Sequence, residues 1–298
     1  MQIKDQFIEL PDGLIVHAPA KINLCLLVAG RRSDGYHQLK TVMAKVALYD
    51  ELTIRPVSAR GIWLTCTGPY WAPAGQENLV FKAAKTLLEA VGSDRGFQIS
   101  LRKQIPAGSG LGSASSDAAA TLLGLARLLC LNDGVDLRQL AAGLGSDVAF
   151  FLDGPLALCT GRGEVVQPIH NTSRFLILLI LPDVHVSTAR VYANYVHDPD
   201  LYARLDAELA PSVAAGKVEQ MAGPGTNMLT GACLRLHPEL AVLKSRIEQL
   251  VGQVSISGSG SAMFRLYDHR SLDKARLDAQ MVTKEVGCTS LVVPSNPW

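Results

Sequence analysis

The sequence predicts a mixed α+β fold in two domains. Segments with strand-like and helix-like patterns follow one another along the chain, without an internal repeat. A strand-like run at 97–101 leads through a glycine-rich segment into a run with helical spacing at 114–129. The 298 residues are enough for two domains with proper hydrophobic cores. We expect a division near residue 165, into an N-terminal domain of 1–165 and a C-terminal domain of 166–298.

Local patterns place the individual elements. Residues 14–29 alternate and then become continuously apolar, which predicts two strands joined through 18–21, where Pro19 has no N–H to donate. A further strand is expected over 39–54. Apolar residues spaced three and four apart predict a helix over 76–91. The other expected elements are a hairpin around Gly161–Gly163, a buried strand at 175–181, a helix capped by Ser187 or Thr188, a loose helix within 199–222, a helix at 238–250, and two strands joined by a glycine turn at 254–264.

Composition excludes several classes of protein. The formal net charge of +1 argues against a nucleic-acid-binding surface. Six cysteines without a C-x-x-C pair are typical of buried thiols in a reducing compartment and do not predict a zinc site. The N-terminus does not resemble a signal peptide, and the longest apolar run, 175–181, is too short to span a membrane. We therefore expect a cytoplasmic protein without a membrane partner, and the sequence leaves monomer and homodimer open.

The glycine-rich segment at 105–117 predicts a phosphate cradle. Gly108, Gly110 and Gly112 allow positive φ and close approach to a ligand, and the following helix offers free N–H groups at its N-terminus. The spacing matches neither G-x-x-x-x-G-K-[ST] nor G-x-G-x-x-G, and a turn that merely caps a helix is the alternative. The expected ATP-binding residues are Pro106, Ala107, Gly108, Ser109, Gly110, Leu111, Gly112, Ser113, Ala114, Ser115 and Ser116.

Three polar residues stand in apolar surroundings. Lys21 and Asn23 are two apart in the first strand region, so they share one face of a strand. Lys21 is either a solvated edge lysine or an inward charge that needs an anionic partner. Asp147 precedes an apolar run, where it is either the N-cap of a short helix or a functional carboxylate.

Three motifs resemble those of the GHMP small-molecule kinases, in the family's order. The segment 106–116 resembles P-x-G-x-G-L-G-S-S-[AS]-[AS]. The segment 144–150 resembles L-G-[AS]-D-V-P-x-F, with Ala149 in place of proline. The segment 254–264 resembles [MS]-[ST]-G-[ST]-G-x-x-x-F, although a simple hairpin fits its local pattern as well. The resemblance implies the two-domain GHMP kinase fold, with a ribosomal-S5-like ATP domain followed by a ferredoxin-like domain.

The N-terminal segments narrow this resemblance to one branch of the family. Residues 18–24 and 30–37 resemble P-A-K-[IL]-N-L followed by G-x-R-x-D-G-Y-H. The branch with this pattern phosphorylates a CDP-alcohol, the cytidine diphosphate ester of methylerythritol, at its 2-hydroxyl in the non-mevalonate isoprenoid pathway. The alternatives are a mevalonate or homoserine kinase and a non-catalytic ligand sensor. The D-G-Y-H element argues against the first, and retention of Lys21 and Asp147 argues against the second.

The resemblance also implies roles for the kinase residues. Asp147 would accept the proton of the attacking hydroxyl, and Lys21 would pair with it and stabilise its charge. ATP would be the co-substrate, and Mg²⁺ would bridge its phosphate oxygens. The sequence does not identify the Mg²⁺ ligands; Ser115 and Ser116 are candidates.

A second set of roles concerns the substrate. Asn23 would lie near the methylerythritol hydroxyls. Tyr36 and Tyr192 would sandwich the cytosine, and His37 would read its edge. A helical aromatic such as Tyr192 is as often a core residue. The segment 226–229 stands where the family often has N-D-L-E, and its acidic residues are absent here.

Overall fold

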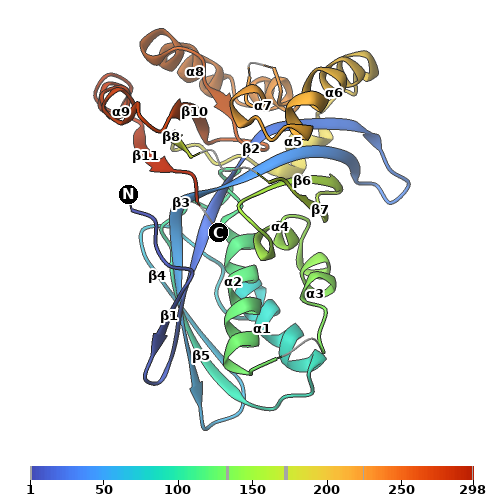
Figure 1. Ribbon diagram of the computed structural model, residues 1–298, viewed down its shortest axis with the longest axis vertical. Coiled ribbons are helices and arrows are strands. Elements are labelled where there is room, and N and C mark those ends of the chain that lie inside the picture. Colours follow the sequence, from blue (N-terminus) through green and yellow to red (C-terminus); the bar gives the residue numbers. More distant parts are fainter. Residues whose placement is uncertain (1, 132–133, 171–173, 224, 297) are drawn as a thin grey trace.

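The computed structural model describes residues 2–131, 134–170, 174–223, 225–296 and 298, and it is built around two sheets (Figure 1). The first is a mixed sheet in which β1, β2, β3, β5 and β4 lie side by side. The β6–β7 hairpin pairs with the N-terminal part of β3. All pairings are antiparallel except that of β4 with β5. Its strands are β1 (Phe7–Leu10), β2 (Gly13–Arg31), β3 (His37–Val57), β4 (Ile62–Thr67), β5 (Gly96–Arg102), β6 (Leu156–Gly161) and β7 (Val165–Pro168).

Strands β2 and β3 are long, and the structure corrects one expectation about them. The two strands expected within 14–29 are one continuous strand, because β-bulges absorb the irregularity that Pro19 introduces. The register against β3 shifts between Pro19 and Ala20 and again between Asn23 and Cys25. In Figure 1 the pair runs from the lower part of the molecule to a tip beside α6 (Pro199–Ala214).

Helices cover one face of the first sheet. Helix α2 packs against β2 and β3, and α1 and α4 pack against α2. The expected helices at 76–91 and after the glycine-rich segment are confirmed, with Asn78 as the N-cap of the first. These helices are α1 (Leu79–Ala90), preceded by the short 3-10 turn η1 (Gly75–Glu77), α2 (Ser113–Leu128), α3 (Leu137–Leu144) and α4 (Val148–Leu152).

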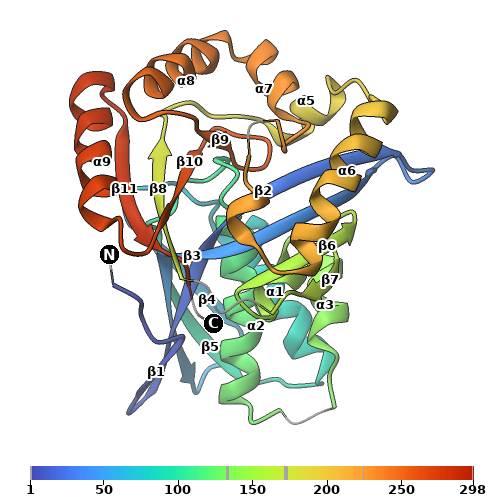
Figure 2. The ribbon, with the colours of Figure 1, turned by 45° about the horizontal axis from the view of Figure 1, so that its top comes forward.

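The second sheet is antiparallel, in the order β11-β8-β10-β9. Helix α9 packs against β8, β10 and β11, and α8 packs against α9, as Figure 2 shows in the orange and red part of the chain. The expected buried strand, the helix capped by Ser187, the helix near 238–250 and the glycine turn between two strands are confirmed. Its elements are β8 (Phe175–Leu181), α5 (Thr188–Ala193), η2 (Val218–Gln220), α7 (Thr230–Leu236), α8 (Pro238–Val251), β9 (Ser255–Ile256), β10 (Met263–Asp268), α9 (Leu272–Val286) and β11 (Thr289–Pro294).

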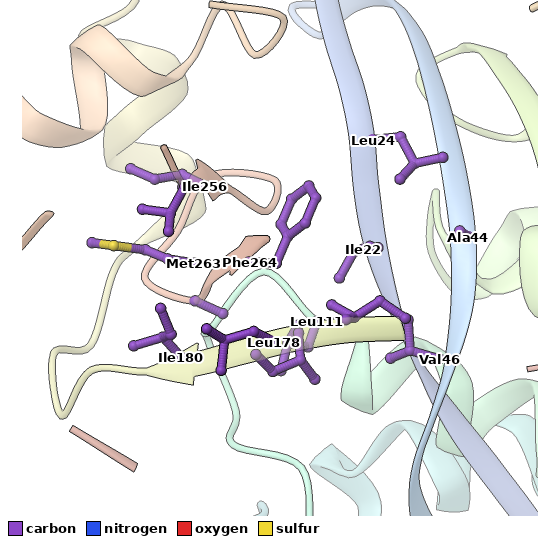
Figure 3. Packing of buried hydrophobic residues seen from close by; sticks show 14 of the residues in the cluster. Ile22, Leu24, Ala44, Val46, Leu111, Leu178, Ile180, Ile256, Met263 and Phe264 are labelled. Carbon is purple, nitrogen blue, oxygen red and sulfur yellow. The ribbon is translucent and has the colours of Figure 1, made fainter. Parts of the chain in front are cut away.

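The two faces of β2 serve different purposes. Ile22 and Leu24 belong to a core shared with the second sheet, in which Ile22 faces Phe264 (Figure 3). Because side chains alternate along a strand, Lys21 and Asn23 face the other way, where Lys21 approaches Asp147 at the start of α4. The core thereby fixes the strand that carries the polar residues at 21 and 23.

The division into domains at residue 165 remains a prediction. Strand β7 begins at Val165 and still pairs with β6 of the first sheet. Among the described residues, every helix is too short or too polar to cross a lipid bilayer.

Candidate active site

A cavity of about 1010 Å³ lies where the glycine-rich loop, β2, β3 and α5 meet. All four residues expected to bind the substrate line it, as do both expected catalytic residues. Nine of the eleven residues expected to bind ATP line it as well; the other two, Leu111 and Ser116, are buried. Its further lining residues include Arg31, Thr41, Arg162, Thr188, Tyr195, His197, Gly258 and Ser259. None of them was assigned an individual role in binding from the sequence, although Arg31 belongs to the 30–37 motif and Gly258 and Ser259 to the 254–264 motif.

The glycine-rich loop has the backbone that its sequence predicts. Gly108, Gly110 and Gly112 have φ angles of +65°, +79° and +71°. A Cβ at Gly110 would lie 2.1 Å from the carbonyl oxygen of Ser257, so this position also requires glycine for space. The hydroxyl of Ser257 donates to the Gly110 carbonyl at 2.9 Å. The loop is therefore held against the glycine turn that precedes β10.

Lys21, Asn23 and Asp147 meet beside this loop. The Lys21 ammonium is only 4% exposed; it donates to Asn23 Oδ1 at 2.6 Å and lies 3.5 Å from Asp147 Oδ2. Asn23 in turn donates to the hydroxyl of Thr41 at 2.9 Å. Lys21 thus has the anionic partner that its burial demands, which excludes the solvated-edge interpretation.

Asp147 occupies the N-cap position of α4, but it is not a capping side chain. Within the described part of the chain, its carboxylate accepts no hydrogen bond from the first turn of that helix. It is instead turned towards Lys21 and remains about one-third exposed, at 32%, to the cavity. Of the two interpretations of this residue, the geometry favours a carboxylate that is free to meet a ligand.

The aromatic residues are arranged differently from a simple sandwich. The Tyr192 and His37 rings are stacked, with centroids 5.3 Å apart, and Tyr195 meets His37 edge-on. Tyr36 is 57% exposed and has the guanidinium of Arg162 over its ring, 5.0 Å from the centroid. Burial lowers the pKa of His37, and the charges of Arg31 and His197 lower it further. The imidazole is therefore neutral near pH 7 and can offer both a donor and an acceptor.

A buried ionic cluster under the loop was not predicted from the sequence. The Lys103 ammonium contacts Asp50, Ser113 and Asp117, and its Nζ lies 2.6 Å from Asp117 Oδ2. Asp50 Oδ1 accepts the backbone N–H of Gln104 at 2.5 Å and that of Ile105 at 2.9 Å, just before the loop. Asp117 could have indicated this cluster, because a carboxylate within an alanine-rich helix needs a charged partner when it is buried.

Two carboxylates share one cation in this cluster. Burial raises the pKa of Asp117 well above its ordinary range; Lys103 opposes this rise, and the charge of Asp50 adds to it. Burial alone would lower the pKa of Lys103, but the two carboxylates raise it. The cluster ties the start of the loop to the first turns of α2.

Metal ligands are sparse in the site. Among the described residues, no group of three or more histidine, cysteine, aspartate or glutamate side chains could hold a metal ion. The described side chains with oxygen atoms that line the cavity are mostly hydroxyls, with the carboxylate of Asp147; Ser115 lines it at the start of α2, while Ser116 is buried.

The fold and this site define a class of protein. Residues 78–155 match the family model described as the GHMP kinases N-terminal domain. Homoserine kinase from Cytophaga hutchinsonii, at 21% identity, has the same fold, with a TM-score of 0.74 over 99% of this chain and 98% of that chain. The protein is an ATP-dependent small-molecule kinase with the GHMP fold.

Two further similarities identify the family within that class. The 4-diphosphocytidyl-2-C-methyl-D-erythritol kinases of Bacillus cytotoxicus and Bacillus cereus are 37% identical over 260 residues, which cover 87% of this chain and 89% of theirs. A crystal structure of 4-(cytidine 5'-diphospho)-2C-methyl-D-erythritol kinase is also 37% identical, with a TM-score of 0.76 over 95% of this chain and all of that chain (100%). The chain belongs to the 4-diphosphocytidyl-2-C-methyl-D-erythritol kinase family.

Proposed function

We propose that the protein transfers the terminal phosphoryl group of ATP to the 2-hydroxyl of 4-diphosphocytidyl-2-C-methyl-D-erythritol. The observation that carries this proposal is the pair of Asp147 and Lys21, 3.5 Å apart beside the glycine-rich loop. Phosphoryl transfer depends mainly on positioning and on neutralising charge, and this pair supplies a base and a cation next to a phosphate cradle.

The residues act on the hydroxyl as follows. Asp147 accepts its proton while the hydroxyl oxygen forms the new bond to the γ-phosphorus. The bond between that phosphorus and the β,γ-bridging oxygen breaks, and ADP leaves with the electron pair. Lys21 offsets the negative charge of Asp147 and of the transferred group, and Asn23 orients Lys21 through their 2.6 Å hydrogen bond.

The glycine-rich loop and the start of α2 hold the ATP phosphates. The positive φ angles at Gly108, Gly110 and Gly112 leave the backbone open to close approach. Mg²⁺, when bound with ATP, neutralises phosphate charge and keeps several waters, which suits a site with few protein oxygen donors. The hydroxyl of Ser115, which lines the cavity at the start of α2, would be one of its protein ligands.

The CDP portion of the substrate occupies the end of the cavity where His37 and Tyr192 stack. Tyr36 and Tyr192 supply aromatic faces for the cytosine, and neutral His37 hydrogen-bonds its edge. Arg31 and Arg162 line the same end and can neutralise the diphosphate.

The direct test is phosphorus NMR of a reaction with Mg-ATP and 4-diphosphocytidyl-2-C-methyl-D-erythritol. We expect a new phosphomonoester signal and stoichiometric ADP. Mevalonate and homoserine serve as competing acceptors at the same concentration. Turnover of either one in preference to the CDP-alcohol would refute the proposed substrate and leave the kinase chemistry intact.

A further inference from the structure

Two lysines lie directly opposite each other on the central strands. Lys21 of β2 and Lys45 of β3 are register partners, so both side chains leave the same face of the sheet. Like charges in this arrangement repel, and burial adds to the cost. Both are nevertheless buried, Lys45 to 1% exposure, so each needs a compensating partner.

The partners of these lysines lie at opposite ends of helix α4. Lys21 approaches Asp147 at the N-terminal end. The Lys45 ammonium donates to the carbonyl of Phe151 at 3.2 Å and to that of Asp153 at 2.5 Å, at the C-terminal end. The helix is therefore held between two cations of neighbouring strands.

We propose that Lys45 is a positioning residue for the kinase reaction: by binding the C-terminal carbonyls of α4, it holds Asp147 in place beside Lys21. The role rests on the proposed function in so far as Asp147 is the base. Lys45 is not among the residues that line the cavity, so it acts through the helix and not on the substrate.

The length of α4 explains the need for such a residue. A helix of five residues has almost no stability of its own, and its last carbonyls have no partner within the helix. A cation at the C-terminal end satisfies those carbonyls and interacts favourably with the helix dipole. Asp147 stands one residue before the helix, so a displacement of α4 displaces the carboxylate as well.

The surroundings of Lys45 keep it away from water. The rings of Phe150 and Trp298 each lie with their centroid 5.9 Å from its ammonium. The backbone N–H of Asn296 donates to the Lys45 carbonyl at 3.0 Å, so the C-terminal segment closes over this part of β3. This shielding makes Lys45 sensitive to pH in a range where ordinary lysines stay charged.

The charged groups around Lys45 set that sensitivity. Burial lowers the pKa of Lys45 to about 8, and the carboxylate of Asp153 opposes this lowering. Asp153 is itself bound by Arg138, at 2.5 Å, and Lys21 faces Lys45 from β2, with Asp147 beyond it. As the pH rises through about 8, Lys45 loses its charge and its hold on the α4 carbonyls weakens.

The first test needs no substrate. Hydrogen exchange is measured for the unliganded wild type, for Lys45→Met and for the control Lys40→Met. Lys40 is another lysine of β3, and it pairs with Asp206 of α6. In Lys45→Met we expect the amides of 148–153 to exchange about tenfold faster, with those of α2 unchanged. Lys40→Met should leave α4 unchanged. Unaltered exchange of α4 in Lys45→Met would overturn the proposal.

The second test separates positioning from stability. At temperatures well below unfolding, we expect kcat of Lys45→Met to fall roughly 10²-fold while the Kd for ATP changes less than about twofold. A parallel loss of kcat, ATP affinity and α2 protection would show general destabilisation and overturn the proposal. If the wild type turned over no CDP-alcohol while the exchange result held, the proposed substrate would fail and the support of α4 by Lys45 would stand.

The pH profile supplies the decisive comparison. In the wild type, kcat should decline above about pH 8, in step with the pKa of Lys45. Lys45→Arg keeps its charge at all accessible pH values, so its profile, normalised to its own maximum, should lose this decline. An identical decline in Lys45→Arg would assign it to another group and refute this mechanism.

Discussion

Asp147 Oδ2 lies 3.5 Å from the Lys21 ammonium, although the two residues come from the start of a short helix and the middle of a long strand. Neither side chain stabilises the secondary-structure element to which it belongs. Asp147 leaves its helix uncapped within the described residues, and Lys21 is buried without a role in the hydrophobic core. Both features cost stability, which is typical of residues retained for chemistry.

The first prediction concerns this carboxylate. Asp147→Asn should reduce kcat by about 10²–10⁴-fold, because asparagine keeps the shape and loses the base. Tm and the Kd for ATP should change little. Steady-state kinetics measure kcat, and calorimetry measures Tm and the Kd for ATP.

Asp136→Asn is the matched control. Asp136 caps α3 and accepts the N–H groups of Arg138 and Gln139, a role that asparagine fills equally well. If Asp147 were only an N-cap, Asp147→Asn would be as silent as Asp136→Asn. Near-normal kcat in a folded Asp147→Asn protein would therefore place proton transfer elsewhere.

The second prediction concerns the contact between the two glycine loops. Gly110→Ala should lower the free energy of unfolding by about 1–3 kcal/mol more than Gly35→Ala does. Both glycines have positive φ, but a Cβ at Gly110 would collide with the Ser257 carbonyl, whereas nothing lies within 4 Å of one at Gly35. Urea unfolding of the two variants measures the difference. Equal losses would mean that the loops separate freely.

Much of the fold followed from patterns within short segments. The helix after the glycine-rich loop, the strand at 175–181 and the hairpin around Gly161–Gly163 are each specified by local periodicity and turn residues. The error at 18–21 has a local cause as well: Pro19 predicts a break, and only the pairing with β3 shows that a bulge accommodates it.

The site was predictable where its residues belong to motifs. Lys21, Asp147 and the glycine-rich loop come together in one cavity as expected. The pairing of Lys103 with Asp50 and Asp117, and that of Lys45 with the end of α4, join residues distant in the chain. Their partners are set by strand register and helix packing, which sequence periodicity does not encode.

The third prediction concerns the buried ionic cluster. Because the folded state raises the pKa of Asp117, the native protein binds that proton more tightly than the unfolded chain. The contribution of Asp117 to the free energy of unfolding is therefore greatest at low pH. It decreases as the pH rises from the ordinary pKa of an aspartate towards the raised pKa of Asp117. Asp117→Asn should remove this loss, so its free energy of unfolding relative to that of the wild type should be higher at pH 8 than at pH 5.

Asp50→Asn is the contrasting variant. Asp50 Oδ1 accepts two backbone N–H groups, and Oδ2 accepts from Lys103 and Ser113. An amide nitrogen in place of Oδ2 would face these donors, so we expect a loss of about 1–3 kcal/mol at both pH values. Urea unfolding at pH 5 and pH 8 checks both variants. The same pH dependence in Asp117→Asn and the wild type would show that Asp117 titrates normally.

The last prediction concerns the recognition of cytosine. Tyr192→Ala and Tyr36→Ala should each weaken binding of the CDP-alcohol by about 1–3 kcal/mol, the scale of base–aromatic stacking. Phenylalanine at either position should retain most of the affinity, because the ring face remains. ATP affinity should stay constant, since neither ring belongs to the glycine-rich loop. Calorimetric Kd values at fixed Mg²⁺ measure these effects.

The two tyrosines should differ in specificity. Tyr192 stacks on His37, whereas the ring of Tyr36 meets Arg162. His37→Ala should relax the preference for cytidine over the matching uridine compound, because it removes the group that reads the base edge. Tyr192→Ala should also relax the preference for cytidine, because His37 loses the ring on which it stacks. Tyr36→Ala should instead lower the affinity for both compounds equally. Full discrimination in Tyr192→Ala, or a loss of ATP affinity alone, would contradict this arrangement of the base site.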